Sequence, residues 1–241
     1  MNTQLNAIQN VQRRILQEFI RICDQHNLRY YMVEGSLLGA VRHQGMIPWD
    51  DDIDVALFRE DYETFLKNAD QELHPPFALH HFSQTPGQID YIARLVDTTS
   101  YIETSYRRNV EHKPLWVDIF VLDGFPSGQL AAKMRKGQLL YRKLLLMWSD
   151  MDHFVVKRAK RPLYERVLIR LGDGLHTSRF LSTERQLKKM DRAMCSCDAG
   201  KTGWAVNFMS EYKWRTVCPT DWYGEARIVP FDGFSVRIPD R

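Results

Sequence analysis

The chain has 241 residues, of which 44% are hydrophobic and 26% are charged. This ordinary globular composition excludes collagen-like, low-complexity and largely disordered proteins. The strongest apolar run, Leu144–Trp148, is far shorter than the roughly 20 residues that a membrane span requires. The first residues alternate polar and apolar side chains, whereas a secretory signal needs a continuous apolar core of about 7–15 residues. We therefore expect a cytoplasmic protein.

Four cysteines do not make a disulfide framework in a chain of this length, which agrees with a cytoplasmic location. Cys195, Cys197 and Cys218 could be compared with zinc ligands, but their spacing lacks the CxxC pairs that zinc sites favour. We expect buried, reduced thiols at these positions instead of a metal site.

The net charge of +3 is too small to indicate a nucleic-acid partner, but the charge is unevenly distributed. The stretch from Gly128 to Gly172 has 11 basic and 3 acidic residues, a net charge of +8, which leaves −5 for the rest of the chain. Such a segment is either a solvated helical face or a surface for an anionic partner: a membrane's inner face, an anionic polymer or a nucleotide. Because it lacks interleaved aromatic residues, we expect no nucleic-acid partner.

Hydrophobic periodicity predicts a mixture of helices and strands. Apolar residues recur at three- and four-residue steps from Leu5 to Ile22 and predict an amphipathic helix that ends near Asn27. The elements expected next are a strand at Arg29–Val33, a turn at Glu34–Ser36, a helix at Leu37–Arg42, a strand at Ile53–Phe58, a helix at Arg59–Asn68 and strands at Phe77–Phe82, Tyr91–Val96 and Leu115–Leu122. The pattern is helical from Gln129 to about Ala199, and short strands are expected at Trp204–Met209, Arg227–Val229 and Phe234–Ile238. This order predicts an α+β fold with a helical insertion.

A cluster of acids precedes the strand predicted at residues 53–58. Asp50, Asp51, Asp52 and Asp54 occupy four of five consecutive positions, and their mutual repulsion calls for protons, basic partners or a cation. Asp52 and Asp54 flank Ile53, so on a strand their carboxylates would share one face. Two such carboxylates suit Mg²⁺, which commonly also binds substrate phosphate oxygens. An EF-hand does not fit the spacing, and a solvated acidic turn is the remaining alternative.

A possible anion site lies upstream of these acids. Gly35 and Ser36 come directly after a predicted strand and before a predicted helix, where backbone N–H groups can bind phosphate. Arg42 and His43 add positive charge to the same short helix. A phosphate cradle followed by paired acids on the next strand is the arrangement that phosphoryl or nucleotidyl transfer requires.

These motifs resemble the LicD family of the polymerase-β-like nucleotidyltransferase superfamily, which is related to fukutin and fukutin-related protein. The resemblance lies in three blocks, GSLLGAVRHQGMIPWDDDIDVALFREDYETFL, WVDIFVLDGFP and DWYGEARIVPFDG. It implies a single transferase domain over residues 1–241, with a small mixed sheet flanked by helices as a catalytic core at 28–126. A basic helical insertion at 128–200 and an aromatic and β segment at 203–241 would complete it. Family members continue past the FDG block, so we expect this last segment to be truncated.

The resemblance also implies an activity: transfer of a phospho-alcohol, typically phosphocholine from CDP-choline, to a hydroxyl of a cell-surface glycan precursor such as lipopolysaccharide, teichoic acid or capsule. Asp52 and Asp54 would hold one or two Mg²⁺ ions, with Mn²⁺ as a substitute, and CMP would leave. By resemblance Asp118 is the third carboxylate, as a metal ligand or as the base for the acceptor hydroxyl. Alternatively, Asp118 is an acid that faces water at the edge of the sheet and has no role in catalysis. Arg94, with Asp97, matches a charged pair of the family, either as a substrate contact or as a structural salt bridge.

A choline group would need aromatic faces around it. Trp222 and Tyr223 in the third block are candidates, as are Trp49 and Trp116, although most tryptophans are core residues. Two other functions stay open: a nucleotidyltransferase that moves a nucleoside monophosphate to another acceptor, and an inactive module that binds nucleotides or glycans.

Overall fold

The computed structural model describes residues 3–105, 110–154 and 162–241, and the chain divides into two compact units. The first unit comprises Met1–Ser100, Pro114–Ser127 and Cys197–Arg241. The second comprises Tyr101–Lys113 and Gly128–Ser196, and its larger part lies within the predicted insertion at 128–200. That the chain forms one transferase domain over residues 1–241 stays a prediction.

The first unit is built on a mixed sheet with the strand order β1-β2-β5-β4-β3. Its strands are β1 (Tyr30–Met32), β2 (Asp54–Phe58), β3 (Phe77–His80), β4 (Ala93–Ser105) and β5 (Val110–Gly124), of which residues 101–105 and 110–113 belong to the second unit. β2 runs parallel to β5, whereas β1 pairs antiparallel with β2 and β3 pairs antiparallel with β4. The short strands β6 (Trp204–Val206) and β7 (Cys218–Pro219) extend the sheet beside the end of β5. The predicted mixed sheet is therefore confirmed.

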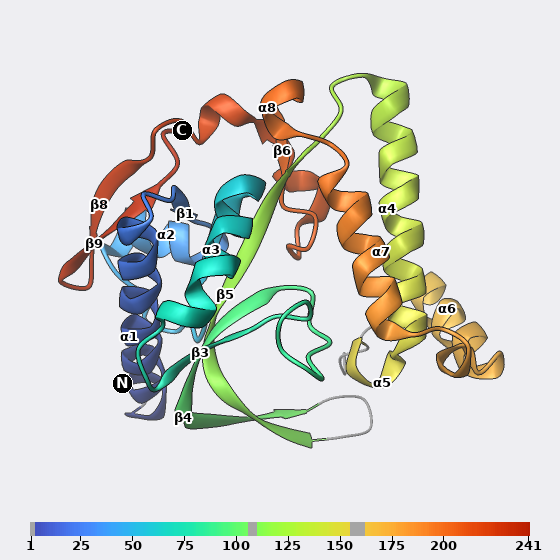
Figure 1. The fold of residues 1–241 in the computed structure, drawn as a ribbon, viewed down its shortest axis with the longest axis horizontal. Coiled ribbons are helices and arrows are strands. Elements are labelled where there is room, and N and C mark those ends of the chain that lie inside the picture. The colour runs from blue at the N-terminus through green and yellow to red at the C-terminus, as the bar shows by residue number, and fades with distance from the viewer. Residues whose placement is uncertain (1–2, 106–109, 155–161) are drawn as a thin grey trace. The chain divides into compact units, whose positions relative to one another are not determined.

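Helices of the first unit flank this sheet, as expected. They are α1 (Thr3–Gln25), α2 (Glu34–His43), α3 (Arg59–Glu72) and the short α8 (Ala199–Thr202). α1 and α3 lie side by side (Figure 1), and Phe19 contacts Phe65 and Tyr30 with ring centroids 4.9 and 5.2 Å apart. The apolar stripe predicted for α1 is the buried side of the helix, because Ile15, Phe19 and Ile22 are inaccessible to solvent.

The C-terminal segment of the first unit adds two 3₁₀ turns, Lys213–Thr216 and Thr220–Trp222, and a hairpin. The hairpin strands β8 (Arg227–Phe231) and β9 (Phe234–Ile238) pair antiparallel around Asp232 and Gly233. Gly233 has φ +91°, a left-handed conformation that glycine adopts without steric cost. The predicted strands at 227–229 and 234–238 are thus confirmed.

Several element boundaries differ from the prediction. α2 begins at Glu34 instead of Leu37, because the chain reverses direction at Glu34 itself, which has φ +52°. β2 begins at Asp54, so Asp52 belongs to the preceding loop and not to the strand. β4 and β5 are longer than expected, because pairing between two long neighbouring strands is not visible in local periodicity.

Over its described residues, the second unit is helical apart from the strand residues 101–105 and 110–113. It contains α4 (Gln129–Ser149), α5 (Met151–Phe154), α6 (Leu163–Gly174), a 3₁₀ turn at Thr177–Arg179 and α7 (Thr183–Cys195). α4 and α7 lie side by side (Figure 1), and their buried side chains include Leu139, Leu146, Leu187, Met190 and Met194. The helical prediction is confirmed here, although the basic residues Lys157, Arg158, Lys160 and Arg161 lie outside the described residues.

Two further expectations concern the whole described chain. No helix in the described ranges is both long enough and apolar enough to cross a membrane. None of the four cysteines, all of which lie in the described ranges, forms a disulfide. Cys195 at the end of α7 is exposed, and Cys197 and Cys218 are partly exposed, so the expectation of buried thiols at these three positions is wrong.

Candidate functional site

Two aspartates lie opposite each other on the parallel strands β2 and β5. Asp54 is the first residue of β2, and Asp118 is its register partner on β5, so both side chains lie on the same face of the sheet. The next pair of partners on that face, Ala56 and Phe120, belongs to the apolar core. Asp54 is itself only 8% exposed. The pair therefore places two carboxylates where a buried apolar face ends.

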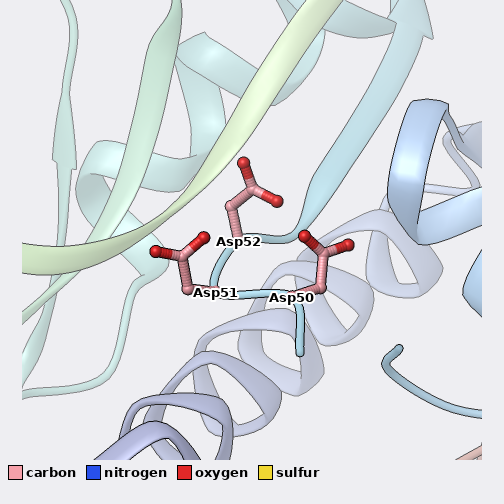
Figure 2. A group of neighbouring side chains, drawn as sticks. All are labelled: Asp50, Asp51 and Asp52. Atoms are coloured by element: carbon pink, nitrogen blue, oxygen red, sulfur yellow. The ribbon is translucent and has the colours of Figure 1, made fainter. Parts of the chain in front are cut away.

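An acidic loop, Asp50–Asp52, leads into β2. One carboxylate oxygen of each of these residues lies within 4.8 Å of those of the other two. Figure 2 shows the three side chains extending from the loop immediately before the strand. The prediction grouped Asp52 with Asp54 and Asp118; the structure additionally brings the carboxylate of Asp52 close to those of Asp50 and Asp51.

Two buried glutamines of α1 hold the backbone of this loop. The Nε2 group of Gln9 donates to the carbonyl oxygens of Ile47 and Asp50, at 3.1 and 2.8 Å. Nε2 of Gln12 donates to the carbonyl oxygen of Asp51 at 2.7 Å and to that of Trp116, on β5, at 3.4 Å. Gln12 thus connects the loop to the strand that carries Asp118.

The first turn of α2 lies against the acidic loop. Ser36 Oγ accepts a hydrogen bond from the backbone N–H of Asp54 at 2.9 Å, which ties this turn to the start of β2. A Cβ atom added to Gly35 would lie 2.8 Å from Oδ2 of Asp50, so the glycine allows the carboxylate to approach the helix. The amide dipoles at a helix N-terminus favour negative charge at this position.

Asp118 is held by two side-chain donors. Arg94 Nε donates to Oδ1 of Asp118 at 2.8 Å, and Trp116 Nε1 donates to Oδ2 at 3.0 Å. The Arg94 guanidinium also binds Asp90 at 2.6 Å and lies 4.6 Å from the centre of the Trp116 ring. Arg94 therefore pairs with Asp118 and Asp90 and not with Asp97, its expected partner, which bonds to Thr99.

Burial and mutual repulsion raise the pKa values of the acids around β2. Burial, followed by the charges of Asp52 and Asp118, raises the pKa of Asp54 to about 9. Burial, followed by the charges of Asp50 and Asp51, raises the pKa of Asp52 to about 6. Burial also raises the pKa of Glu34, the first residue of α2. This concentration of negative charge favours bound protons or a bound cation.

The donor set fits a hard divalent cation. Mg²⁺ prefers carboxylate oxygens, and the acidic loop with Asp54 supplies them next to a helix N-terminus where phosphate oxygens could bind. The buried oxygen Oε1 of Glu34 has no hydrogen-bond partner among the described residues, and the charge of Glu34 is one of those that raise the pKa of Asp54. An acceptor left without a donor beside repelling carboxylates is what a cation would satisfy.

Arg42 and His43 lie elsewhere on α2. Both belong to its last turn, roughly 10 Å along the axis from Gly35 at 1.5 Å per residue. His43 contacts the exposed Trp49 edge to face, with ring centroids 6.2 Å apart. The structure therefore does not bring these two residues to the N-terminus of the helix.

The two aromatic candidates of the third block occupy different environments. Tyr223 is buried in the core, where its ring packs against Tyr31 and Phe58 with centroids 4.9 and 5.2 Å apart. Trp222 is 46% exposed. The structure thus makes Tyr223 a packing residue and leaves only Trp222 of the pair accessible to a ligand.

Several residues of this site, Gln9, Gln12 and Glu34, were not predicted from the sequence. Gln9 and Gln12 lie on the buried side of α1, where Gln12 precedes Leu16 and Phe19 at helical spacing, and polar residues at such positions are a usable signal. Outside this site, at the other end of β5, the buried Asp123 accepts from Arg59 through both carboxylate oxygens, at 2.8 and 2.6 Å. No sequence pattern pointed to Glu34, because its position beside the acids depends on the positive φ of its own backbone.

Acids on neighbouring parallel strands beside a helix N-terminus define a site suited to cation-assisted binding of phosphate groups. Residues 27–143 match the family model described as LicD/FKTN/FKRP, nucleotidyltransferase domain. The resemblance of this chain to the LicD family is thereby confirmed.

Individual proteins similar to this chain are consistent with the family match. The chain is 31% identical over 151 residues to the lipopolysaccharide cholinephosphotransferase LicD of Haemophilus influenzae, covering 60% of this chain and 56% of that protein. It is 29% identical over 150 residues to an uncharacterized protein of Rickettsia prowazekii, covering 62% and 44%. Over 42 residues it is 43% identical to the human ribitol 5-phosphate transferase FKRP, covering 17% of this chain and 8% of that protein. The chain spans about half the length of the first two relatives.

Proposed function

We propose that this chain is a Mg²⁺-dependent transferase that moves a phospho-alcohol from a CDP-alcohol to a hydroxyl of a cell-surface glycan precursor and releases CMP. The proposed donor is CDP-choline, after the relative named as a lipopolysaccharide cholinephosphotransferase. The observation that carries the proposal is the register pairing of Asp54 with Asp118 beside the acidic loop. Both transferases among the relatives act with a phosphate-containing group, as their names state.

The fold proposed for the first unit is that of the polymerase-β-like nucleotidyltransferases. A mixed sheet with acids on two adjacent parallel strands, flanked by helices, supports it. The match of residues 27–143 to a nucleotidyltransferase-domain family supports it independently.

Asp52 and Asp54 would hold the magnesium ion, together with Asp50 or Glu34. Bound Mg²⁺ supplies charge neutralisation for the donor diphosphate in reactions of this class. The backbone N–H groups at Gly35 and Ser36 would orient the phosphate oxygens. The hydrogen bond that Ser36 Oγ accepts from the backbone N–H of Asp54 holds the helix next to the acids. Gln9 and Gln12 would keep the loop in place.

Asp118 would accept the proton of the acceptor hydroxyl while the oxygen of that hydroxyl forms a bond to the transferred phosphorus. The phosphoanhydride bond to CMP breaks in the same exchange, and CMP leaves. Arg94 and Trp116 fix the orientation of the Asp118 carboxylate, which a proton acceptor needs. Trp222 is the accessible aromatic residue for the choline group.

A thermal-shift comparison of CDP-choline, CDP-ribitol and CDP-glycerol, each with Mg²⁺ or with EDTA, tests the proposal. A true donor at 100 times its Kd should add about 2.7 kcal/mol to the free energy of unfolding, and only with Mg²⁺. Analysis of released CMP or pyrophosphate then identifies the reaction. Pyrophosphate released from a nucleoside triphosphate would favour the alternative nucleotidyltransferase, and Mg²⁺-independent binding without turnover would favour an inactive binding module.

A further inference from the structure

Helix α6 of the second unit exposes a continuous apolar stripe. Leu163, Val167 and Leu171 follow one another at four-residue steps, which places them along one side of the helix. Tyr164 and Leu175 widen this side. We call these five residues the α6 stripe; their exposed fractions are 74% for Leu163, 65% for Tyr164, 47% for Val167, 49% for Leu171 and 62% for Leu175.

The opposite side of α6 is packed within the second unit. Gly172 lies about half a turn around the helix from Leu163, and a Cβ added there would lie 2.8 Å from Cδ1 of Trp148 and 2.9 Å from Sδ of Met151. Trp148 Nε1 also donates to the carbonyl oxygen of Leu168 at 3.0 Å. The helix is therefore already docked on its inner side, and the α6 stripe is not the face that packs against the rest of the unit.

The border of the stripe is basic. Arg166 and Arg170 are exposed and follow each other at a four-residue step, on the side of the helix next to Leu163. Glu165 lies toward the opposite, packed side. The surrounding sequence from Gly128 to Gly172 has a net charge of +8. An apolar helical stripe bordered by arginines is the pattern of helices that lie in the interface of an anionic bilayer.

From this geometry we propose that the α6 stripe docks the chain on the surface of a membrane that contains anionic phospholipid. The five apolar side chains enter the headgroup boundary, and Arg166 and Arg170 contact lipid phosphates. A second copy of the chain fits the surface less well, because a stable protein interface takes roughly 20–30 residues a side and the stripe offers five. The proposal does not depend on the proposed chemistry of the first unit.

Vesicle co-sedimentation tests this docking with the full chain. Vesicles of phosphatidylcholine mixed with phosphatidylglycerol should bind the protein, and vesicles of phosphatidylcholine alone should not. Binding should weaken with added salt, and by about fivefold for each of Arg166→Gln and Arg170→Gln. Failure of the protein to bind anionic vesicles would overturn the proposal.

Matched substitutions separate the stripe from general surface hydrophobicity. Leu163→Glu and Leu171→Glu should each abolish vesicle binding, whereas Ile228→Glu, at a residue 70% exposed on β8, should leave it unchanged. All three positions are exposed, so the thermal unfolding midpoints should match that of the parent chain. Equal binding by the α6 variants and the parent would overturn the proposal. So would loss of self-association in these variants with unchanged vesicle binding, since a second copy would then be the occupant.

Discussion

Asp54 and Asp118 are register partners on parallel strands, and within the described ranges basic and indole donors hold Asp118 but not Asp54. Arg94 and Trp116 bind both oxygens of Asp118, whereas Asp54 faces the charges of Asp52, Asp118 and Glu34. The two carboxylates therefore differ in environment although they occupy equivalent positions of the sheet. This difference suits two roles, with Asp54 binding a proton or a cation and Asp118 kept in one orientation.

The raised pKa of Asp54 predicts a specific pH dependence of stability. Its pKa of about 9 in the folded state exceeds the ordinary aspartate value of about 4, so between these pH values the folded state binds the extra proton. The free energy of unfolding should therefore fall as the pH rises from about 4 to about 9. Asp54→Asn should flatten this fall in urea unfolding measured with EDTA. An identical slope in the variant would contradict the assignment.

Gln12→Met should loosen the acidic loop without unfolding the chain. The variant loses the donor to the carbonyl oxygens of Asp51 and Trp116, at a cost of about 1–3 kcal/mol for buried acceptors left unsatisfied. We expect Mn²⁺ affinity, followed by electron paramagnetic resonance, to fall together with stability. Gln17→Met, the same change at an exposed position of α1, is the control and should alter neither quantity. Unchanged metal affinity in Gln12→Met would remove the glutamine from the site.

Arg94→Lys should weaken the orientation of Asp118. Lysine cannot reproduce the planar fork with which Arg94 binds Asp118 and Asp90 together while lying over Trp116. A double-mutant cycle of Arg94→Lys with Asp118→Asn in CMP release should show a coupling energy of about 0.5–3 kcal/mol. Additive effects of the two changes would mean that Arg94 acts independently of Asp118.

Replacement by alanine should affect the stability of the chain differently at two glycines that lie in helices. Gly137 of α4 has open space around it, so Gly137→Ala should stabilise the chain by about 0.5–1 kcal/mol. Gly35→Ala should lose that gain, because its Cβ would lie 2.8 Å from Oδ2 of Asp50. The displaced carboxylate should also lower the affinity for Mg²⁺, measured by calorimetry. A stabilised Gly35→Ala with unchanged affinity would show that the close approach is unimportant.

Substitutions of Trp222 and Tyr223 should differ in their cost to stability, because Trp222 lies at the surface and Tyr223 in the core. Tyr223→Ala removes a buried ring that packs on Tyr31 and Phe58, which should cost about 3–5 kcal/mol in denaturant unfolding. Trp222→Ala should cost far less, because the side chain is half exposed. If Trp222 contacts choline, its loss should raise the KM for CDP-choline more than that for CDP-glycerol. Equal changes for both donors would exclude that contact.

Local patterns predicted much of the fold because they reflect burial within one element. The apolar stripe of α1 and the apolar run of β2 gave the correct element types, since each buries a face against the sheet or beside a parallel neighbour. The start of α2 at Glu34 was not predictable in this way. Its backbone reverses at a non-glycine residue with φ +52°, and no local preference of glutamate signals that conformation.

The partners within the site depend on contacts between distant segments. The sequence placed Asp54 and Asp118 together only through resemblance to a family, and the register of β2 with β5 brings them opposite each other. The pairing of Arg94 with Asp118 instead of Asp97 follows from the position of β4 next to β5. Such relationships arise from sheet order, which spacing along one strand does not encode.

The most direct test of the account is CMP release from CDP-choline by purified Asp118→Asn with Mg²⁺ present. The substitution keeps the size of the side chain but removes its negative charge and one of the two oxygens that accept from Arg94 and Trp116. It thereby removes the capacity to accept the acceptor's proton, so we predict a fall of about 10²–10⁴-fold relative to the parent chain. The thermal unfolding of the variant should remain cooperative. Turnover by Asp118→Asn equal to that of the parent would contradict the account.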